Sequence, residues 1–280
     1  MNKLNSERQA QIVKALCEGN SIRSTARMTG SAINTVVKLL TELGAACAEY
    51  HNNTMWKLPC KRIQCDEIWS FCYSKQKNVP EEHQGEFGYG DVWTWTAIDA
   101  DTKLIPAWFV GLRNAECASA FLNDLAERLT TKHIQLTTDG HKVYLDAVES
   151  AFAGNVDYAM LVKLYGNERQ SEARYSPAEC TGTEIKVIQG NPKIDHISTS
   201  YVERQNLTMR MSMRRFTRLT NAFSKKIENH EAAIALYFMH YNFARPHKSL
   251  ANPYPRTPAM AVGIADHVWT VEEIVGLLSK

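Results

Sequence analysis

The chain has 280 residues with a net charge of +2 at pH 7, and 44% of its residues are hydrophobic, the composition of a globular protein with one ordinary core and a small accessory domain. The longest apolar stretches fall short of the roughly 20 residues that a membrane helix needs, and no basic-then-apolar leader opens the sequence. We therefore expect a cytoplasmic protein without membrane contact. Seven irregularly spaced cysteines predict free thiols rather than a disulfide framework.

Positive charge is concentrated in the last third of the chain. Between residues 201 and 256, ten lysines and arginines stand against three glutamates, a net charge of +7, so the remainder of the chain carries −5. A basic block in an otherwise acidic chain favours a polyanionic partner that contacts one region. A solvated helical surface is the alternative interpretation, because charge speaks to association and not to fold.

The first 43 residues predict three short helices. Gly19 and Gly30 mark the ends of the first two, and Ser21 and Ser31 are placed to cap the second and third. Two helices joined by a tight turn and preceded by a third resemble a helix-turn-helix unit, whose third helix enters the major groove. An ordinary three-helix cap would show the same pattern. In a DNA-binding unit, the residues that meet base edges would include Asn34, Thr35 and Lys38.

We interpret residues 1–44 as this DNA-binding domain and residues 45–60, which lack periodicity, as a linker. From residue 61 strands and helices alternate. The expected strands cover residues 62–71, 92–98, 104–110, 133–138 and 158–164. Three consecutive strands before the first helix exclude a doubly wound nucleotide-binding topology and predict a mixed five-stranded sheet flanked by helices, in the α/β class.

The segment after the fifth strand is predicted to be an insertion, because residues 166–198 are polar and broken by glycine and proline. It contains one short strand-like piece, at residues 184–189. A long helix is expected from residue 199 to at least residue 216, and another over residues 226–243. Residues 259–280 form a tail with a short amphipathic helix.

Three carboxylates stand at positions that favour a metal site. Asp66 lies within the first strand, Asp139 ends the fourth, and Glu203 lies in the first turns of the long helix. Acidic groups brought together repel one another, and a hard divalent cation relieves that repulsion. Two Mg²⁺ ions can activate a water or a 3′-hydroxyl and stabilise the leaving oxygen of a phosphodiester. Glu67 is the alternative to Asp66, but adjacent strand residues point to opposite faces, and we prefer Asp66.

The long helix combines an acid with a row of cations. At about 100° per residue, its apolar residues share one face and can pack on the sheet, while Glu203 shares the adjoining face with arginines. A salt-bridged surface is the alternative to a metal ligand beside phosphate-binding cations. The proposed phosphate contacts are Arg204, Arg210, Arg214, Arg215 and Arg218.

These motifs resemble the DDE transposases of the bacterial insertion-sequence-one type. The resemblance rests on residues 65–69, 138–140, 200–206 and 240–247. It implies an RNase H-like catalytic domain over residues 61–258, with Asp66, Asp139 and Glu203 as catalytic and metal-binding triad. It also implies Mg²⁺ or Mn²⁺ dependence and a homo-oligomer that binds terminal inverted repeats and target DNA at the bacterial nucleoid.

The expected activity is metal-dependent DNA strand cleavage and strand transfer at insertion-sequence ends. Two other functions fit part of the pattern. A domesticated DNA-binding protein could retain the fold without activity, although all three acids are present. A nuclease of the RNase H type that acts on hybrids would explain the sheet, but neither the N-terminal helices nor the basic block.

Overall fold

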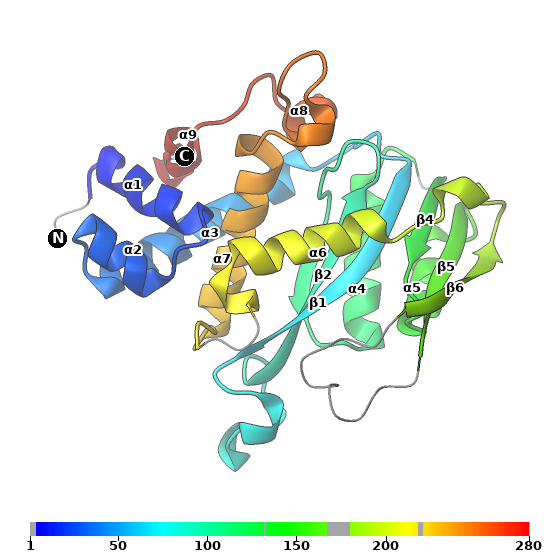
Figure 1. Cartoon of the computed structure of the whole chain (residues 1–280), viewed down its shortest axis with the longest axis horizontal. Coiled ribbons are helices and arrows are strands. Elements are labelled where there is room, and N and C mark those ends of the chain that lie inside the picture. The colour runs from blue at the N-terminus through cyan, green and yellow to red at the C-terminus, as the bar shows by residue number, and fades with distance from the viewer. Residues whose placement is uncertain (1–3, 132, 167–179, 218–220, 280) are drawn as a thin grey trace.

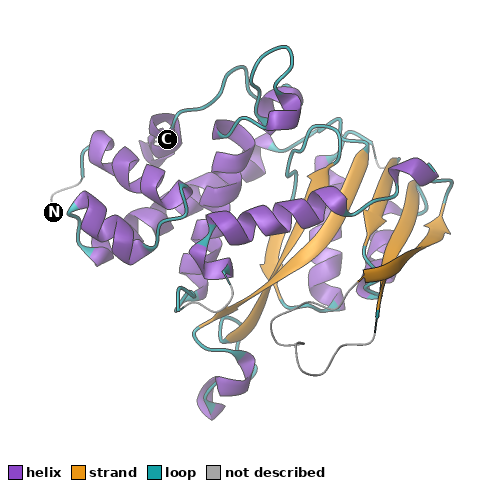
Figure 2. Ribbon diagram, in the orientation of Figure 1, coloured by secondary structure: helices purple, strands orange, loops and turns teal. Residues whose placement is uncertain are grey.

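The computed structural model describes residues 4–131, 133–166, 180–217 and 221–279. A sheet with helices on both faces lies beside a second group of helices from both ends of the chain (Figures 1 and 2). Within the described residues, no helix is long and apolar enough to span a bilayer.

Nine α-helices and six strands make up the regular structure of the described residues. The helices are α1 (Ser6–Cys17), α2 (Ile22–Thr29), α3 (Ile33–Thr54), α4 (Ala115–Arg128), α5 (Val143–Phe152), α6 (Ser200–Ser212), α7 (Ile227–Met239), α8 (Pro258–Ala261) and α9 (Val271–Gly276). The strands are β1 (Arg62–Cys72), β2 (Gly90–Asp99), β3 (Trp108–Gly111), β4 (Ile134–Thr138), β5 (Val156–Tyr165) and β6 (Cys180–Gln189).

The sheet is mixed, as predicted, but it has six strands rather than five, in the order β3-β2-β1-β4-β5-β6. Strands β1, β4 and β5 run parallel, and the other pairs are antiparallel. The additional strand, β6, lies inside the segment interpreted as an insertion. The sequence indicates only its second half, as the strand-like piece at residues 184–189, and does not assign that piece to the sheet. Most side chains of β6 are exposed, so the strand lacks the buried face of a core strand.

Helices cover both faces of the sheet. In Figure 1, α6 crosses in front of β1 and β2, while α4 and α5 lie behind the strands. Strand β2 is buried along most of its length, since both faces are covered. Its Trp95 contacts Phe121 of α4 and Tyr144 of α5, with ring centroids 6.1 and 5.5 Å apart. The core between β2 and these helices is therefore aromatic.

The N-terminal helices follow the predicted order, with two differences. Ser21 caps α2 through the backbone N–H of Ser24, and Gly30 ends it at a φ of 59°, but Ala32 rather than Ser31 precedes α3. The larger difference is the predicted linker: residues 45–54 continue α3, and only residues 55–61 connect it to β1. The sequence interpretation is wrong here because this part of α3 packs on α7, a contact that local periodicity does not reveal.

Helix α6, the first α-helix after β6, is shorter than predicted. Helix α6 ends at Ser212 rather than continuing to residue 216, and Arg214–Phe216 form a separate 3-10 turn. The apolar face survives this break, since Val202, Met209, Met213 and Phe216 are all buried. Near the C-terminus, α9 packs on α1, so the two ends of the chain lie together in Figure 1.

Candidate active site

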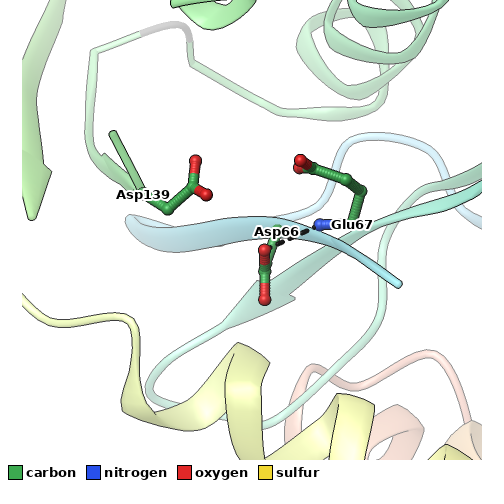
Figure 3. A group of neighbouring side chains, drawn as sticks. All are labelled: Asp66, Glu67 and Asp139. Carbon is green, nitrogen blue, oxygen red and sulfur yellow. Dashed lines mark hydrogen bonds between the residues drawn. The ribbon is translucent and has the colours of Figure 1, made fainter. Parts of the chain in front are cut away.

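Two adjacent acids of β1 point to opposite sides of the sheet, as strand alternation predicts. Figure 3 shows the carboxylate of Asp66 on the side of α6 and that of Glu67 on the other side. The amide Nδ2 of Asn206 in α6 donates to Asp66 Oδ2 at 2.8 Å. The preferred acid of the pair therefore faces the helix that carries Glu203.

Asp139 follows β4, the parallel neighbour of β1, and joins these two acids. One ligand oxygen each from Asp66, Glu67 and Asp139 lie within 4.8 Å of one another. The backbone N–H of His141 donates to Asp139 Oδ1 at 2.9 Å, which fixes the carboxylate at the start of the next turn. Parallel pairing of β1 with β4 is what brings together acids 73 residues apart in the chain.

Crowding of the acids raises the pKa values of two of them. The pKa of Asp66 rises from an ordinary 3.8 to about 7, because burial disfavours its charged form and Glu67, Asp139 and Glu203 repel that charge. The pKa of Glu67 is also raised, by burial and by Asp139. A divalent cation beside these oxygens would favour ionisation of both.

Glu67 differs from Asp66 in having a cation of its own. Arg113, which precedes α4, donates from Nε to Glu67 Oε1 at 2.6 Å, and the hydroxyl of Tyr144 donates to Oε2 at 2.9 Å. The side chain of Glu67 is only 1% exposed. One oxygen thus takes part in an ion pair and the other in a hydrogen bond with Tyr144, and a role in holding the acids in place fits the buried Glu67 better than a role as metal ligand.

Glu203 lies in the first turn of α6 but outside the three-acid group. Lys163 of β5 donates to its Oε2 and Thr199 to its Oε1, both at 2.5 Å. The two ion-paired side chains are 32% and 36% exposed, and exposed ion pairs contribute little stability. The structure therefore brings two of the three predicted acids, Asp66 and Asp139, together. Glu203 lies beside them in an ion pair with Lys163, and breaking this exposed ion pair would cost little stability.

Polar groups that sequence reasoning missed position α6 on the sheet. The side-chain oxygen of Gln64 in β1 accepts from the backbone N–H groups of Tyr201 and Val202, at 2.9 and 3.2 Å. These are two of the N–H groups that a helix leaves unpaired at its start. One turn after Glu203, Asn206 binds Asp66. The sequence does contain signals for both groups. Gln64 is a polar residue in an apolar strand, and Asn206 lies on the side of the helix that is predicted to face the sheet.

The donor set suits a hard divalent cation. The three clustered acids offer oxygen, which Mg²⁺ and Mn²⁺ prefer. Two further buried atoms near the acids have no hydrogen-bond partner among the described residues: the side-chain oxygen of Asn206 and Nε2 of His141. Buried polar atoms of this kind normally find a partner, and a metal or its water shell would provide one here.

The predicted DNA contacts fall into two settings. Arg204 and Arg214 are exposed, whereas Arg215 is partly buried and donates to Ser224 and to the backbone of Asn229. Arg210 is partly buried and already has a partner, and Arg218 lies outside the described residues. Because α6 ends at Ser212, Arg214 and Arg215 are not on the helical face to which the sequence assigned them.

The predicted contacts of the N-terminal unit lie near the start of α3. Asn34 and Lys38 are exposed and Thr35 is partly exposed. The ammonium group of Lys38 lies 3.6 Å from the carboxylate of Glu42, one turn further along the helix. All three side chains are accessible to a ligand.

One segment of the chain is similar to a known family. Residues 180–244 match the family model described as IS1 transposase, and this segment contains β6, α6 with Glu203, and α7. Asp66 and Asp139 lie outside it. No curated protein matches the chain.

Among solved structures, the chain matches a crystal structure of a pre-cleavage Mos1 transpososome. The two sequences are 11% identical, and the TM-score is 0.25. The match covers 56% of this chain and 60% of the Mos1 chain, so it spans less than two thirds of the length of the Mos1 chain. It is the family match that bears on function: the chain carries a segment similar to the IS1 transposases.

Proposed function

We propose that this protein is a DNA transposase that cleaves DNA strands at insertion-sequence ends and joins them to target DNA. The observation that carries the proposal is the meeting of Asp66 and Asp139 on neighbouring parallel strands, beside a helix whose Glu203 lies in the segment similar to IS1 transposases. An RNase H-like arrangement of the sheet is consistent with it.

Asp66, Asp139 and Glu203 are the proposed metal-binding acids. Divalent cations bound there, two Mg²⁺ or Mn²⁺ ions, would supply Lewis acidity for activating a water or a 3′-hydroxyl and for stabilising the leaving oxygen. Both acids have hydrogen bonds on both of their oxygens, and they differ in exposure. Glu67 is the less suitable third acid because its side chain is buried, whereas Glu203 and its partner Lys163 are both partly exposed.

The chain's own groups would prepare this site for a DNA strand. Asn206 orients Asp66 through its amide, and Gln64 holds the start of α6, so Glu203 stays beside β1. Lys163 keeps the Glu203 carboxylate paired until a ligand displaces it. Arg204, exposed on α6 next to Glu203, is placed to contact a backbone phosphate.

The N-terminal helices are the proposed element for recognising the inverted repeats, and the active form on DNA is proposed to be a homo-oligomer. Asn34, Thr35 and Lys38 are accessible near the start of α3, the part of a recognition helix that meets base edges. We propose a helix-turn-helix domain over residues 1–44 followed by the catalytic domain, although α3 extends past this boundary.

The test compares strand cleavage by the wild-type protein and two variants. Purified protein is incubated with an end-bearing duplex and Mg²⁺ or Mn²⁺, and products are resolved on a denaturing gel. Asp139→Asn should reduce cleavage at least 100-fold, because it removes a charged metal ligand. The matched control is Asp146→Asn, an exposed acid of α5, which should cleave like the wild type.

Binding of the same duplex without metal separates catalysis from recognition. Asp139→Asn should bind as well as the wild type, since the substitution leaves the basic surfaces intact. Cleavage that survives Asp139→Asn contradicts the site. A wild-type protein that binds ends but cleaves with neither metal supports the alternative, a catalytically inactive domesticated DNA-binding protein.

A further inference from the structure

A cleft of about 1070 Å³ separates the N-terminal helices from the chain that follows α6. One wall comes from the turn between α1 and α2 and the start of α3, the other from residues 212–215, residues 221–225 and α7. The cleft is larger than most small-molecule pockets, which hold about 300–1,000 Å³. It lies at the opposite end of α6 from Glu203.

The charged side chains of the cleft are all cations. Arg23 comes from the N-terminal wall, and Arg214, Arg215 and Lys225 come from the other wall, while no aspartate or glutamate is among the described residues that line it. Four cations that face one enclosed space repel one another unless an anion lies between them. Charge complementarity therefore favours a polyanion as the occupant.

Arg215 is the cation of the cleft whose position is fixed by hydrogen bonds. Its Nη1 donates to Ser224 Oγ at 2.7 Å and to the backbone oxygen of Asn229 at 2.6 Å, which fixes the guanidinium. Among the described residues no carboxylate lies within 4.0 Å of it. Burial lowers its pKa to about 10, so the group stays charged at neutral pH. A fixed, partly buried cation without an acidic partner is a site for an anion.

The remaining surface of the cleft is largely apolar and partly aromatic. Ile22, Ile33 and Val37 line the N-terminal wall, and Phe223 and Tyr237 line the other. Stacked bases inside a duplex cannot reach such a surface, whereas the unstacked bases of a single strand can lie against aromatic rings. Cations together with aromatic rings form the usual binding surface for single-stranded nucleic acid.

We propose that this cleft binds a single DNA strand, with its phosphates on Arg23, Arg214, Arg215 and Lys225 and at least one unstacked base against the partly exposed Phe223. The proposal rests on the proposed function, because it extends the path of the DNA beyond the acids. Nine residues of α6 separate Glu203 from Ser212, a rise of about 14 Å. A stacked strand rises ~3.4 Å per nucleotide and covers that distance in roughly four nucleotides, whereas an unstacked strand needs fewer.

The test uses a matched pair of neighbouring lysines. Lys225 lines the cleft and Lys226 does not, and both are exposed, so Lys225→Glu and Lys226→Glu make the same charge change at adjacent positions. Binding of a fluorescein-labelled 12-nucleotide oligothymidylate is measured by anisotropy in EDTA at several salt concentrations. Lys225→Glu should weaken binding at least five-fold and lower the salt slope by about 0.7, one phosphate contact on a single strand. Lys226→Glu should stay within two-fold of the wild type.

A second measurement locates the base. An oligonucleotide with 5-iodouracil is photo-crosslinked to the wild-type protein, and the adducts are mapped by mass spectrometry, with Phe223 as the expected site. Equal losses in both lysine variants, or adducts exclusively outside the cleft, overturn the proposal. Thymidine monophosphate that binds as tightly as the oligonucleotide would assign the cleft to a free nucleotide and also overturn it.

The outcome is separable from the proposed function. The measurements need neither metal nor cleavage, and Asp146→Asn, a variant of an exposed acid outside the site, should bind the oligonucleotide like the wild type. Strand binding that depends on Lys225 in a protein that never cleaves DNA supports the cleft and contradicts the transposase activity.

Discussion

Asp66→Asn should stabilise the metal-free protein at pH 8. In the folded chain the Asp66 carboxylate lies close to Glu67 and Asp139, and a single amide, from Asn206, donates to it from α6. Ionisation at this position adds negative charge where two other acids already lie. Asparagine keeps the shape of the side chain and removes the charge, but its single oxygen can accept only one of the two bonds that Asp66 accepts, from the amide of Asn206 and from the backbone N–H of Glu67.

The size of the effect follows from the pKa shift. The folded-state pKa of Asp66 is about 7 against an ordinary 3.8, and each pKa unit corresponds to about 1.4 kcal/mol. Between these two values the folded state holds a proton that the unfolded state has lost, so stability falls as pH rises. The fall attributable to Asp66 between pH 5 and pH 8 is roughly 3 kcal/mol.

The assay is urea unfolding in EDTA at pH 5, 6, 7 and 8. The free energy of unfolding of the wild type should fall across this range by roughly 3 kcal/mol more than that of Asp66→Asn. Asp146→Asn, which removes an exposed acid, should follow the wild-type curve. Adding Mg²⁺ at pH 8 should raise the stability of the wild type by about 2.7 kcal/mol at a hundred-fold excess over its dissociation constant, and that of Asp66→Asn by less.

Parallel pH curves for the wild type and Asp66→Asn would refute the reasoning. They would mean that Asp66 ionises in the folded chain as easily as in the unfolded one, and that the acids do not crowd one another. Equal stabilisation of both proteins by Mg²⁺ would place the cation elsewhere.

Two further predictions concern the groups that hold the site. Gln64→Leu removes the acceptor for the N–H groups of Tyr201 and Val202 and should cost roughly 2 kcal/mol in urea unfolding; a loss below about 0.5 kcal/mol would show that water replaces the cap. Arg113→Met leaves Glu67 buried without its cation and should cost about 3 kcal/mol. Most of that loss should be restored by adding Glu67→Gln, and a double variant no more stable than Arg113→Met alone would exclude the ion pair as the cause.

The sequence identifies features that depend on neighbours in the chain. Strand alternation separates Asp66 from Glu67 correctly, and the glycine after Asp139 marks the end of β4. Asn114 caps α4 as expected from its residue type. Each of these conclusions needs only a few adjacent residues and one rule of backbone geometry.

The features that the sequence does not reveal depend on distant contacts. Lys163 meets Glu203 across 40 residues, and Arg113 meets Glu67 across 46. The end of α6 at Ser212 also escapes prediction, because the arginines that follow have good helix propensity. A contact between residues far apart in the sequence cannot be predicted from the local sequence around either residue.

Helix α6 connects the features that matter most for the proposed chemistry. Gln64 holds its first turn, Glu203 and Asn206 lie one turn apart on it, and its last residue borders the cleft. A helix of 13 residues is a rigid rod of about 20 Å. The carboxylate of Glu203 and the amide of Asn206, which orients Asp66, therefore move together. A ligand in the cleft that tilts α6 would shift both groups at the other end of the helix. Such a linkage is reciprocal, so occupancy of the acids would in turn alter affinity in the cleft.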